Sequence, residues 1–567
     1  MEIQELKAFD FPNIFSLREP IVSAKAIIEE AKKRNIPVSL INEGELIRLG
    51  HGKYQKLISA AMNEGASSIS VDFASDKQLT KRIFGAESIP IPYGDARQNV
   101  EEALEASDEI AYPIVIKPEN GNNGKLSILE ENADHDNRIR FKPNLRVKRN
   151  DASSILDMLF PEDQPFSVPI VSITGTNGKT TTTRMISRII KNAGYTVGTT
   201  TTHGIYVNDK CLEEGDTTGP LSARRALYHK EIDAAVLETA RGGIIRAGLA
   251  YEKADVAVFT NLSEDHLGID DINSMEDLLN VKSIVVEAVK DEGFCILNAD
   301  DPWVMKTRER AKGNHVLISL DESNPILIDH INNLRCAVYK KENSIFVTNG
   351  GIDLELVKIN HIPATLNGNL KHNIYNSMAA IGACFSLNIS LDIIRDTLKT
   401  FSCNADINPG RFNVYNMGDF KVVLDYGHNI EGYSVTIDGL KSLKPSRLTG
   451  IIGVPGDRRD KDIKKIGRIA GISFDKIIIK EDLELRGRKQ FEVARILLSG
   501  ALEGNIDKNN ISVIQNEVEA LKEAALNAKS GEVIVVFFEK MEPLVEFLNN
   551  FSEQENNLKL SEEPISV

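Results

Sequence analysis

The stretch that decides the fold is VSITGTNGKTTTT, from Val171 to Thr183. The apolar residues up to Ile173 predict a buried strand, and Met185 and Ile186 begin a run of apolar residues at helical spacing after the threonines. A glycine-rich turn between a strand and a helix is a place where backbone N–H groups and the helix N-terminus bind phosphate. The stretch therefore predicts a nucleotide-binding loop.

Each residue type in this turn has a physical role in that interpretation. Gly175 and Gly178 let the backbone approach the phosphates, and Lys179 neutralises charge on the terminal phosphates. The Thr180 hydroxyl is a ligand for Mg²⁺. Two residues separate the glycines, whereas the common phosphate-binding loop has four, which points away from GTPases and kinases. The alternative is a glycine turn without a ligand, which the lysine and threonine in register disfavour.

Composition limits the partners of the chain. Its 567 residues predict about three or four domains. The net charge of −15 and the pI of 5.3 exclude nucleic acid as the main partner, because phosphate binding needs a basic face. The apolar run VIVVFF is too short for a bilayer span, so no membrane partner is expected. Scattered cysteines and an N-terminus without signal-peptide features favour the cytoplasm.

Alternating strand and helix patterns predict an α/β fold with mainly parallel sheets. The expected segments are a mixed α/β N-terminal region (1–130), a connector (131–165), a central ATP-binding domain (166–407), a smaller Rossmann-like C-terminal domain (408–551) and a disordered tail (552–567). The connector and the tail are predicted from polar, charge-rich composition.

Motifs spread along the chain resemble the ordered signature of the Mur ligase superfamily. They are GTNGKTTTT at 175–183, ETARGGI at 238–244, NLSEDHLG at 261–268, HNIYNSMAA at 372–380, NPGR at 408–411 and DYGHN at 425–429. Longer segments, such as GVPGDRRDKDIKKIG and IIIKEDLELRGR, resemble the C-terminal half of the cyanophycin synthetase family. The resemblance implies a Mur ligase-like central P-loop ATPase domain followed by a C-terminal α/β domain.

Members of the cyanophycin synthetase family also carry an ATP-grasp module, and YPIVIKPENGNNGK from Tyr112 to Lys125 resembles part of one. Only about 45 residues separate Gly124 from Ile170, which leaves no room for the second lobe of that module. Lys117 and its glycine loop are therefore interpreted as a structural ATP-grasp remnant without a working ATP site, and weak retained nucleotide binding is the alternative. One ATP-using site remains.

The resemblance also implies the residues of that site. Nucleotide binding is assigned to Gly175, Thr176, Asn177, Gly178, Lys179, Thr180, Thr181, Asn373, Asn376, Arg411 and Asp425. The catalytic residues are Lys179, Glu238, His266 and Lys282, and Mg²⁺ is assigned to Thr180, Glu238 and His266. Substrate contacts are assigned to Thr218, Arg241, His428, Glu481 and Asp482.

Several of these assignments have alternatives. Lys282 is either a carbamylated lysine near a second metal or a plain helix lysine. Asn373 meets adenine or caps a helix. Glu481 and Asp482 suit a cationic amino acid, but a solvated charged loop has the same composition.

The predicted function is an ATP- and Mg²⁺-dependent amide ligase. ATP activates a carboxylate as an acyl phosphate, and the resemblance implies that arginine or another basic amino acid then couples to an aspartate-rich peptide. One alternative is the same chemistry with another substrate pair, such as glutamate onto glutamate. Another is a non-catalytic ATP-binding subunit of a complete synthetase. Assembly of identical subunits is left open.

Overall fold

The structure is a computed structural model of the whole chain. It describes residues 22–41, 46–59, 62–67, 76–86, 114–116, 127–129, 151–162, 164–265 and 267–561, with a few single positions between 91 and 106. These residues divide into two units, one formed by residues 1–50 and 54–167 and the other by residues 51–53 and 168–567. Each unit is described by itself.

The first unit contains a small antiparallel sheet in the order β1-β2-β3-β4. Its elements are α1 (Val22–Lys33), β1 (Val38–Ile41), β2 (Leu46–Leu49), β3 (Lys56–Ser59), β4 (Met62–Asn63), α3 (Lys77–Ala86), β5 (Ile114–Ile116), β6 (Ser127–Leu129) and α5 (Asp151–Leu159). Ile27 of α1, Ile47 and Leu49 of β2 and Leu156 of α5 form one buried cluster. Helix α5 lies in the segment predicted as connector, so that segment contributes to a core.

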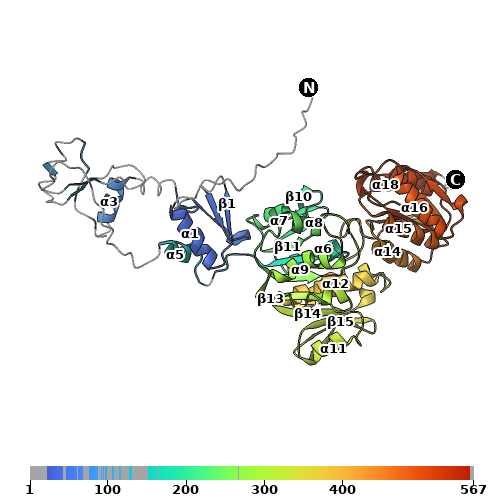
Figure 1. The fold of residues 1–567 in the computed structure, drawn as a ribbon, viewed down its shortest axis with the longest axis horizontal. Helices are drawn as coiled ribbons and strands as arrows, with labels where there is room; N and C mark the ends of the chain where they lie inside the picture. The colour runs from blue at the N-terminus through green and yellow to red at the C-terminus, as the bar shows by residue number, and fades with distance from the viewer. Residues whose placement is uncertain are drawn as a thin grey trace, which may run out of the picture. The chain divides into compact units, whose positions relative to one another are not determined.

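The second unit begins with an eleven-stranded sheet in the order β10-β9-β8-β11-β7-β12-β13-β14-β15-β16-β17 (Figure 1). Its strands are β7 (Ile170–Thr174), β8 (Val197–Thr201), β9 (Gly204–Val207), β10 (Lys210–Glu214), β11 (Ala234–Glu238), β12 (Ala254–Phe259), β13 (Val289–Asn298), β14 (Asn314–Ser319), β15 (Ala337–Lys341), β16 (Ser344–Asn349) and β17 (Ile352–Lys358). Neighbouring strands from β8 to β15 are parallel, as predicted, and antiparallel pairs complete both edges.

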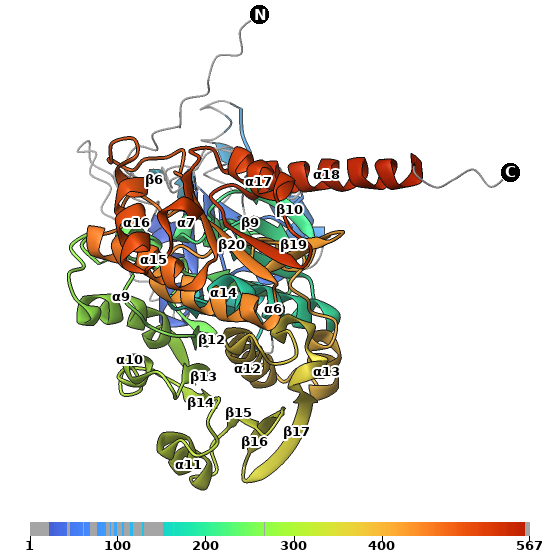
Figure 2. The same cartoon turned by 90° about the vertical axis from the view of Figure 1, so that its right-hand side faces the viewer.

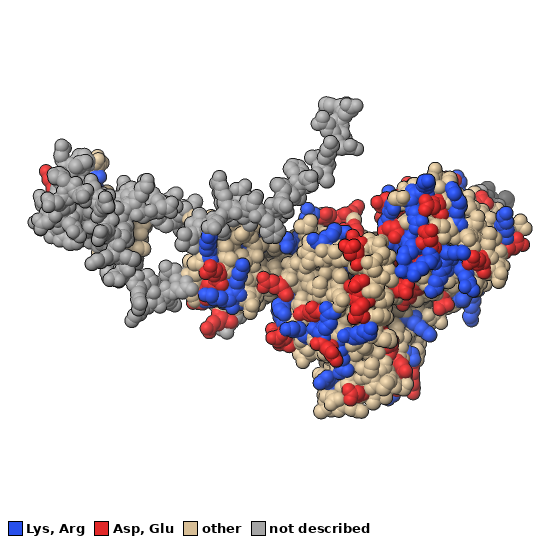
Figure 3. Space-filling model, in the orientation of Figure 1, with Lys and Arg blue, Asp and Glu red and all other residues tan. Residues whose placement is uncertain are grey.

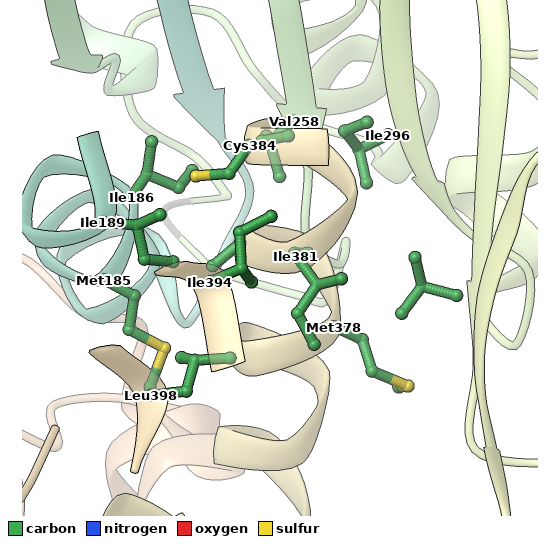
Figure 4. Packing of buried hydrophobic residues seen from close by; sticks show 14 of the residues in the cluster. Met185, Ile186, Ile189, Val258, Ile296, Met378, Ile381, Cys384, Ile394 and Leu398 are labelled. Atoms are coloured by element: carbon green, nitrogen blue, oxygen red, sulfur yellow. The ribbon is translucent and has the colours of Figure 1, made fainter. Parts of the chain in front are cut away.

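Helices cover both faces of this central sheet. They are α6 (Lys179–Asn192), α7 (Pro220–Leu227), α8 (Arg241–Ala247), α9 (Met275–Glu287), α10 (Pro302–Met305), α11 (Pro325–Asn332), α12 (Lys371–Ser386) and α13 (Leu391–Leu398). On one face, Ile189 of α6 packs in a cluster with Ile381 of α12 and Val258 of β12 (Figure 4). Residues of α8, α9, α10 and α11 form a second cluster with alternate strand residues. Burying each such isoleucine contributes about 1.5–3 kcal/mol.

A second, six-stranded sheet forms the C-terminal domain, in the order β18-β19-β23-β20-β21-β22. Its elements are β18 (Asn413–Met417), β19 (Phe420–Asp425), α14 (Ile430–Ser442), β20 (Arg447–Ile452), α15 (Asp460–Ser473), β21 (Lys476–Ile479), α16 (Glu492–Glu503), β22 (Ile511–Val513), α17 (Glu517–Leu526), β23 (Glu532–Phe537) and α18 (Met541–Ser561). Helices α14, α15 and α16 pack on one face, and α17 and α18 on the other (Figure 2). The predicted order of two α/β domains is confirmed.

The C-terminal end departs from the predicted tail. Helix α18 continues to Ser561, so most of the segment expected to be disordered is helical. Leucine, glutamate, glutamine and lysine, which have high helix propensity, recur in this segment and offset its polar composition. Residues 562–567 lie outside the described part of the chain.

Surface charge in the described chain is mixed. Lysine and arginine side chains are interspersed with aspartate and glutamate over the C-terminal domain, on the face that Figure 3 shows. Among the described residues, no helix combines the length and the hydropathy that crossing a membrane requires.

Candidate active site

The phosphate loop connects β7 to α6 and depends on two glycines. Gly175 has φ +146°, and a Cβ atom there would lie 1.9 Å from the Thr260 hydroxyl oxygen. Gly178 has φ +85°, and its Cβ would lie 2.3 Å from the Asn376 side-chain oxygen. Only glycine fits both the backbone conformation and the space. Helix α6 then begins at Lys179 without a side-chain cap, so its first N–H groups remain available for a phosphate.

Lys179 folds back onto this loop. Its Nζ donates to the carbonyl oxygens of Gly175, at 3.2 Å, and Thr176, at 2.9 Å. Burial lowers the pKa of Lys179, while Glu238 acts in the opposite direction. An ammonium group held by neutral carbonyls is placed to bind a phosphate.

Thr180 and Glu238 form a pair of oxygen donors next to the loop. The Thr180 hydroxyl donates to Glu238 Oε1 at 3.1 Å, and the Thr202 backbone N–H donates to Oε2 at 3.3 Å. Glu238 is 2% exposed at the end of β11, and burial raises the pKa of its carboxyl group. Arg411 Nη2 donates to the Thr180 hydroxyl at 3.0 Å, which brings a cation from the start of the C-terminal domain.

This pair fits Mg²⁺ chemically. Mg²⁺ prefers oxygen ligands and commonly binds one or two carboxylates, waters and substrate phosphates. Within the described residues, no group of three or more histidine, cysteine and acidic side chains is arranged for a metal. Thr180 and Glu238 supply only two protein ligands. They therefore suit a metal ion whose other ligands are waters and the phosphates of a bound nucleotide. His266, the third predicted ligand, lies outside the described residues, so its assignment stays a prediction.

Lys282 contacts the phosphate loop from helix α9. It is 5% exposed on α9, and its Nζ donates to the Thr176 hydroxyl at 3.2 Å. Burial lowers its pKa well below the ordinary value, and the charge of Lys179 lowers it further. No carboxylate among the described residues forms an ion pair with it. Carbamylation of Lys282 stays a prediction.

A cavity of about 490 Å³ opens beside the loop, between the central and C-terminal domains. Predicted nucleotide residues that line it are Thr176, Asn177, Gly178, Lys179, Thr180, Thr181, Asn373, Asn376, Arg411 and Asp425. Asn376 Nδ2 donates to Asn373 Oδ1 at 3.0 Å. The residue that caps α12 is Leu370, so Asn373 does not have the capping role that was its alternative. The Asp425 carboxylate accepts bonds from the Phe412 and Gly427 N–H groups.

The far end of this cavity contains residues that the sequence analysis did not select. They are Asn298 at the end of β13, Asp300, Asp301 and Trp303 after it, and Tyr375 of α12. The Tyr375 hydroxyl donates to Asp300 Oδ2 at 2.8 Å. The run NADDPW directly after a buried strand was the available signal, since parallel strands present their carboxyl ends to ligands.

A second cavity, of about 770 Å³, lies on the other side of the phosphate loop. Thr176, Lys179 and His428 line both cavities. Its charged lining residues are Lys179, Arg241, Arg246, Lys282 and Arg486, with Asp216, Asp265, Asp270 and Asp457. Thr218 also lies there, so the structure brings together three of the predicted substrate residues, Thr218, Arg241 and His428.

Two predicted substrate residues lie elsewhere. Asp482 pairs with Lys480 at 2.6 Å, and Glu481 Oε2 accepts the Phe491 N–H at 2.8 Å. Glu481 is 5% exposed, and neither carboxylate lines either cavity. Both carboxylates make contacts inside the C-terminal domain. Their placement therefore does not support the prediction that they bind the cationic side chain of a substrate amino acid. The charged residue of this loop that lines the second cavity is Arg486.

Glu431, at the start of α14, holds the C-terminal domain against the phosphate loop. Its Oε2 accepts bonds from Asn177 Nδ2 at 2.8 Å and from the Ser263 hydroxyl at 2.6 Å. Asn429 Nδ2 also donates to Asn177 Oδ1, at 3.1 Å. The two domains are therefore in contact at the residues that would surround a bound nucleotide.

We expect Glu431→Gln to lower kcat/KM for ATP about thirtyfold, because two charge-assisted hydrogen bonds become neutral ones, each weaker by about 1 kcal/mol. The measurement is ADP release in the presence of substrate amino acid and acceptor. Asp438→Asn, an exposed change on the same helix, serves as the control. Equal kcat/KM values for the two variants would show that Glu431 does not stabilise the closed arrangement.

The fold and the site define a Mur ligase-type protein. Residues 173–384 match the family model of the Mur ligase middle domain, and residues 410–537 match that of the Mur ligase glutamate ligase domain. The chain therefore carries the middle and C-terminal domains of the Mur ligases.

Curated relatives with similar sequences are cyanophycin synthetases. That of Crocosphaera subtropica is 38% identical over 441 residues, which cover 78% of this chain and 50% of the relative. The chain thus spans about half the length of that relative. The synthetase of a Nostoc species is 28% identical over 701 aligned positions, which cover 93% of this chain and 78% of the relative. A 2,6-diaminopimelate ligase of Clostridium acetobutylicum is 28% identical over 398 residues, which cover 68% of this chain and 76% of the relative.

Proposed function

We propose that the chain is an ATP- and Mg²⁺-dependent amide ligase that couples an amino acid to the carboxylate of an acidic peptide. The observation that carries this proposal is the meeting of two cavities at Lys179, Thr176 and His428. One cavity contains the phosphate loop, and the other is lined with charged side chains that suit a carboxylate substrate. A ligase needs this arrangement, because the terminal phosphate of ATP must reach an acceptor carboxylate.

The proposed reaction has two steps. An acceptor carboxylate oxygen attacks the γ-phosphorus, and the bond from that phosphorus to the β,γ-bridging oxygen breaks. This step releases ADP and forms an acyl phosphate on the acceptor. The neutral amine of the amino acid then attacks the acyl carbon, the bond from that carbon to the phosphate oxygen breaks, and the amine loses a proton to solvent. The products are an amide and inorganic phosphate.

The residues around the loop suit these steps. Lys179 lies where charge accumulates on the transferred phosphoryl group, and Arg411 brings a second cation to Thr180. Thr180 and Glu238 would hold Mg²⁺, which neutralises charge on the phosphates when bound. Burial of His428 lowers its pKa to about 4, so at neutral pH its imidazole is uncharged.

The second cavity suits an acidic acceptor through a small excess of cationic side chains, five lysines and arginines against four aspartates. Arg241, Arg246 and Lys282 are the cations that α8 and α9 contribute. The acceptor that we propose is an aspartate-rich peptide, because the relatives with similar sequences are cyanophycin synthetases. On the same ground, the incoming amino acid is proposed to be arginine or another basic one.

One observation favours the alternative substrate pair. Glu481 and Asp482 lie outside the cavity, whereas Arg486 lines it, paired with Asp457 at 2.9 Å, and is a cation that suits a carboxylate on the incoming amino acid. A ligase that adds glutamate is therefore the second candidate.

We also propose that the chain has a single ATP site and acts in the cytoplasm. The alignment with the Nostoc synthetase has 701 positions, more than the 567 residues of this chain, so parts of that relative have no counterpart here. That supports an ATP-grasp region without its second lobe. Lys117 and the glycine loop at 121–124 lie outside the described residues, so the remnant stays a prediction.

The experiment that tests the function is a screen for ADP release with ATP and Mg²⁺. Arginine, lysine, glutamate and aspartate are each supplied with an aspartate-rich or a glutamate-rich peptide, and the product is identified by mass spectrometry. Release that needs arginine and the aspartate-rich peptide supports the proposal, and release with glutamate supports the alternative. Absence of release with every pair would contradict an amide ligase acting on these substrates.

Arg241→Met is expected to raise KM for the acceptor more than tenfold, while KM for ATP stays within about twofold, because loss of a buried charge partner costs about 2–5 kcal/mol. The Arg241 side chain is 10% exposed, and methionine keeps its apolar stem. Steady-state ADP release over a range of acceptor concentrations measures the effect. Arg225→Met, at a side chain that is 63% exposed, is the control. An unchanged acceptor KM would remove Arg241 from the acceptor site.

A further inference from the structure

A third cavity, of about 440 Å³, lies apart from the two already described and shares no lining residue with either. Its walls come from α6, from β8 and β9, and from the segment between α13 and β18. That volume lies within the range of small-molecule sites in proteins, about 300–1,000 Å³.

Three cations of α6 line this cavity. Arg184, Arg188 and Lys191 are four and three residues apart, a spacing that places them on one side of a helix. Tyr206 of β9 lies in the same lining and adds a phenolic hydroxyl.

The two arginines lack acidic partners. Arg188 forms no hydrogen bond or ion pair with any residue in the described part of the chain, although its Nε is buried. Arg184 Nη1 donates only to neutral acceptors, Asn408 Oδ1 at 3.2 Å and the Pro409 carbonyl at 2.9 Å. Burial lowers the pKa of Arg184 to about 10, and the charge of Arg411 acts in the same direction.

The lining also contains two carboxylates, but neither pairs with Arg184 or Arg188. Asp209 pairs with Lys191, and Asp406 forms no ion pair with a described residue. A buried guanidinium atom without a partner costs stability, because it has given up its water without a replacement. An anion that entered the cavity would supply the missing acceptors.

We propose that this cavity binds a small ligand through an oxyanion group, a carboxylate or a phosphate, which Arg188 holds bidentately with support from Lys191. The planar guanidinium presents paired donors that match both kinds of oxyanion. The ligand is distinct from ATP and from the acceptor peptide, whose cavities have other walls.

Hydrogen bonds link the lining of this cavity to residues beside the phosphate loop. Asn408, which accepts from Arg184, also donates from Nδ2 to the Thr181 hydroxyl at 3.2 Å. Arg411 follows three residues later and reaches Thr180. Arg184, which lines the cavity, is therefore joined through Asn408 to the helix that follows the phosphate loop.

The test is equilibrium titration of the full chain by calorimetry, with inorganic phosphate and with succinate as separate probes. A saturating non-hydrolysable ATP analogue and Mg²⁺ occupy the nucleotide cavity throughout. The expected result is a saturable binding component of one probe per chain, weakened at least tenfold in Arg188→Met. Lys191→Met should weaken the same binding component. If Arg188→Met lowers the melting temperature, so that its weaker binding could result from instability, the affinity of Lys191→Met decides the test.

Arg335→Met, at an exposed arginine outside this cavity, is the matched control and should bind like the unchanged chain. Binding of phosphate alone, of succinate alone or of both supports the site and identifies its ligand chemistry, provided that Arg188→Met or Lys191→Met weakens it. Absence of saturable binding with both probes would overturn the proposal. So would affinities in both cavity variants equal to that of Arg335→Met.

Discussion

Lys179→Ala is expected to reduce amino-acid-dependent ADP formation by about 10²–10³, the usual effect of removing one group that stabilises charge in a transition state. Lys179 lines both the nucleotide cavity and the second cavity. Among the described residues, no other lysine or arginine lines both of them. The bonds of Lys179 to the Gly175 and Thr176 carbonyls contribute little to the fold. The melting temperature should therefore change little.

The measurement is steady-state turnover with saturating amino acid and acceptor, together with ATP affinity by calorimetry. Lys441→Ala, on the exposed side of α14, controls for removal of a surface charge. Near-normal ADP formation by Lys179→Ala would refute the assignment of the phosphate loop.

Asp482→Asn is expected to lower the free energy of unfolding of the C-terminal domain by about 3 kcal/mol, because removing one partner of a buried ion pair leaves a charge uncompensated. Lys480 is 1% exposed, and Asp482 and Glu517 lie 2.6 and 3.2 Å from its Nζ. Burial alone would lower the pKa of Lys480, but these two carboxylates together raise it above its ordinary value. Glu517 keeps the loss at the lower end of the range for buried pairs.

Urea unfolding, followed by hydrogen exchange in β21, measures this effect in the domain concerned. Glu484→Gln, in the same loop and 74% exposed, should change stability by no more than about 0.5 kcal/mol. KM for the amino acid should remain close to normal in both variants. A tenfold rise in KM for the amino acid in Asp482→Asn, without loss of stability, would instead show that Asp482 binds the substrate amino acid.

The contrast between these two residues explains what could be predicted from sequence. The phosphate loop is local: its strand, glycines, lysine and helix follow one another within the stretch 171–190, and the physical role of each is visible in that order. The charge of Asp482 is visible too, but its partner Lys480 also pairs with Glu517, which lies far along the chain in α17. Only the folded structure shows that Lys480 is buried between these two carboxylates and that the charge of Asp482 is already neutralised.

Glu431 and helix α5 show the same limit. Glu431 follows the DYGHN motif, yet its partners Asn177 and Ser263 belong to the other domain. Helix α5 adjoins a polar segment, and its contribution to a core depends on α1 and β2, far earlier in the chain. Composition and periodicity predict elements and their order, whereas the pairing of charged groups depends on which elements meet.

The contacts of Asn177 have a consequence for how fast the nucleotide enters. Asn177 is bonded to both Asn429 and Glu431, so these bonds join the C-terminal domain to the phosphate loop. If ATP enters only when these bonds are broken, the fraction of open molecules sets its apparent association rate. At high ATP concentration the rate of loading then reaches a ceiling equal to the rate of opening. With the proposed reaction, tight closure would protect the acyl phosphate from water and would slow each new cycle.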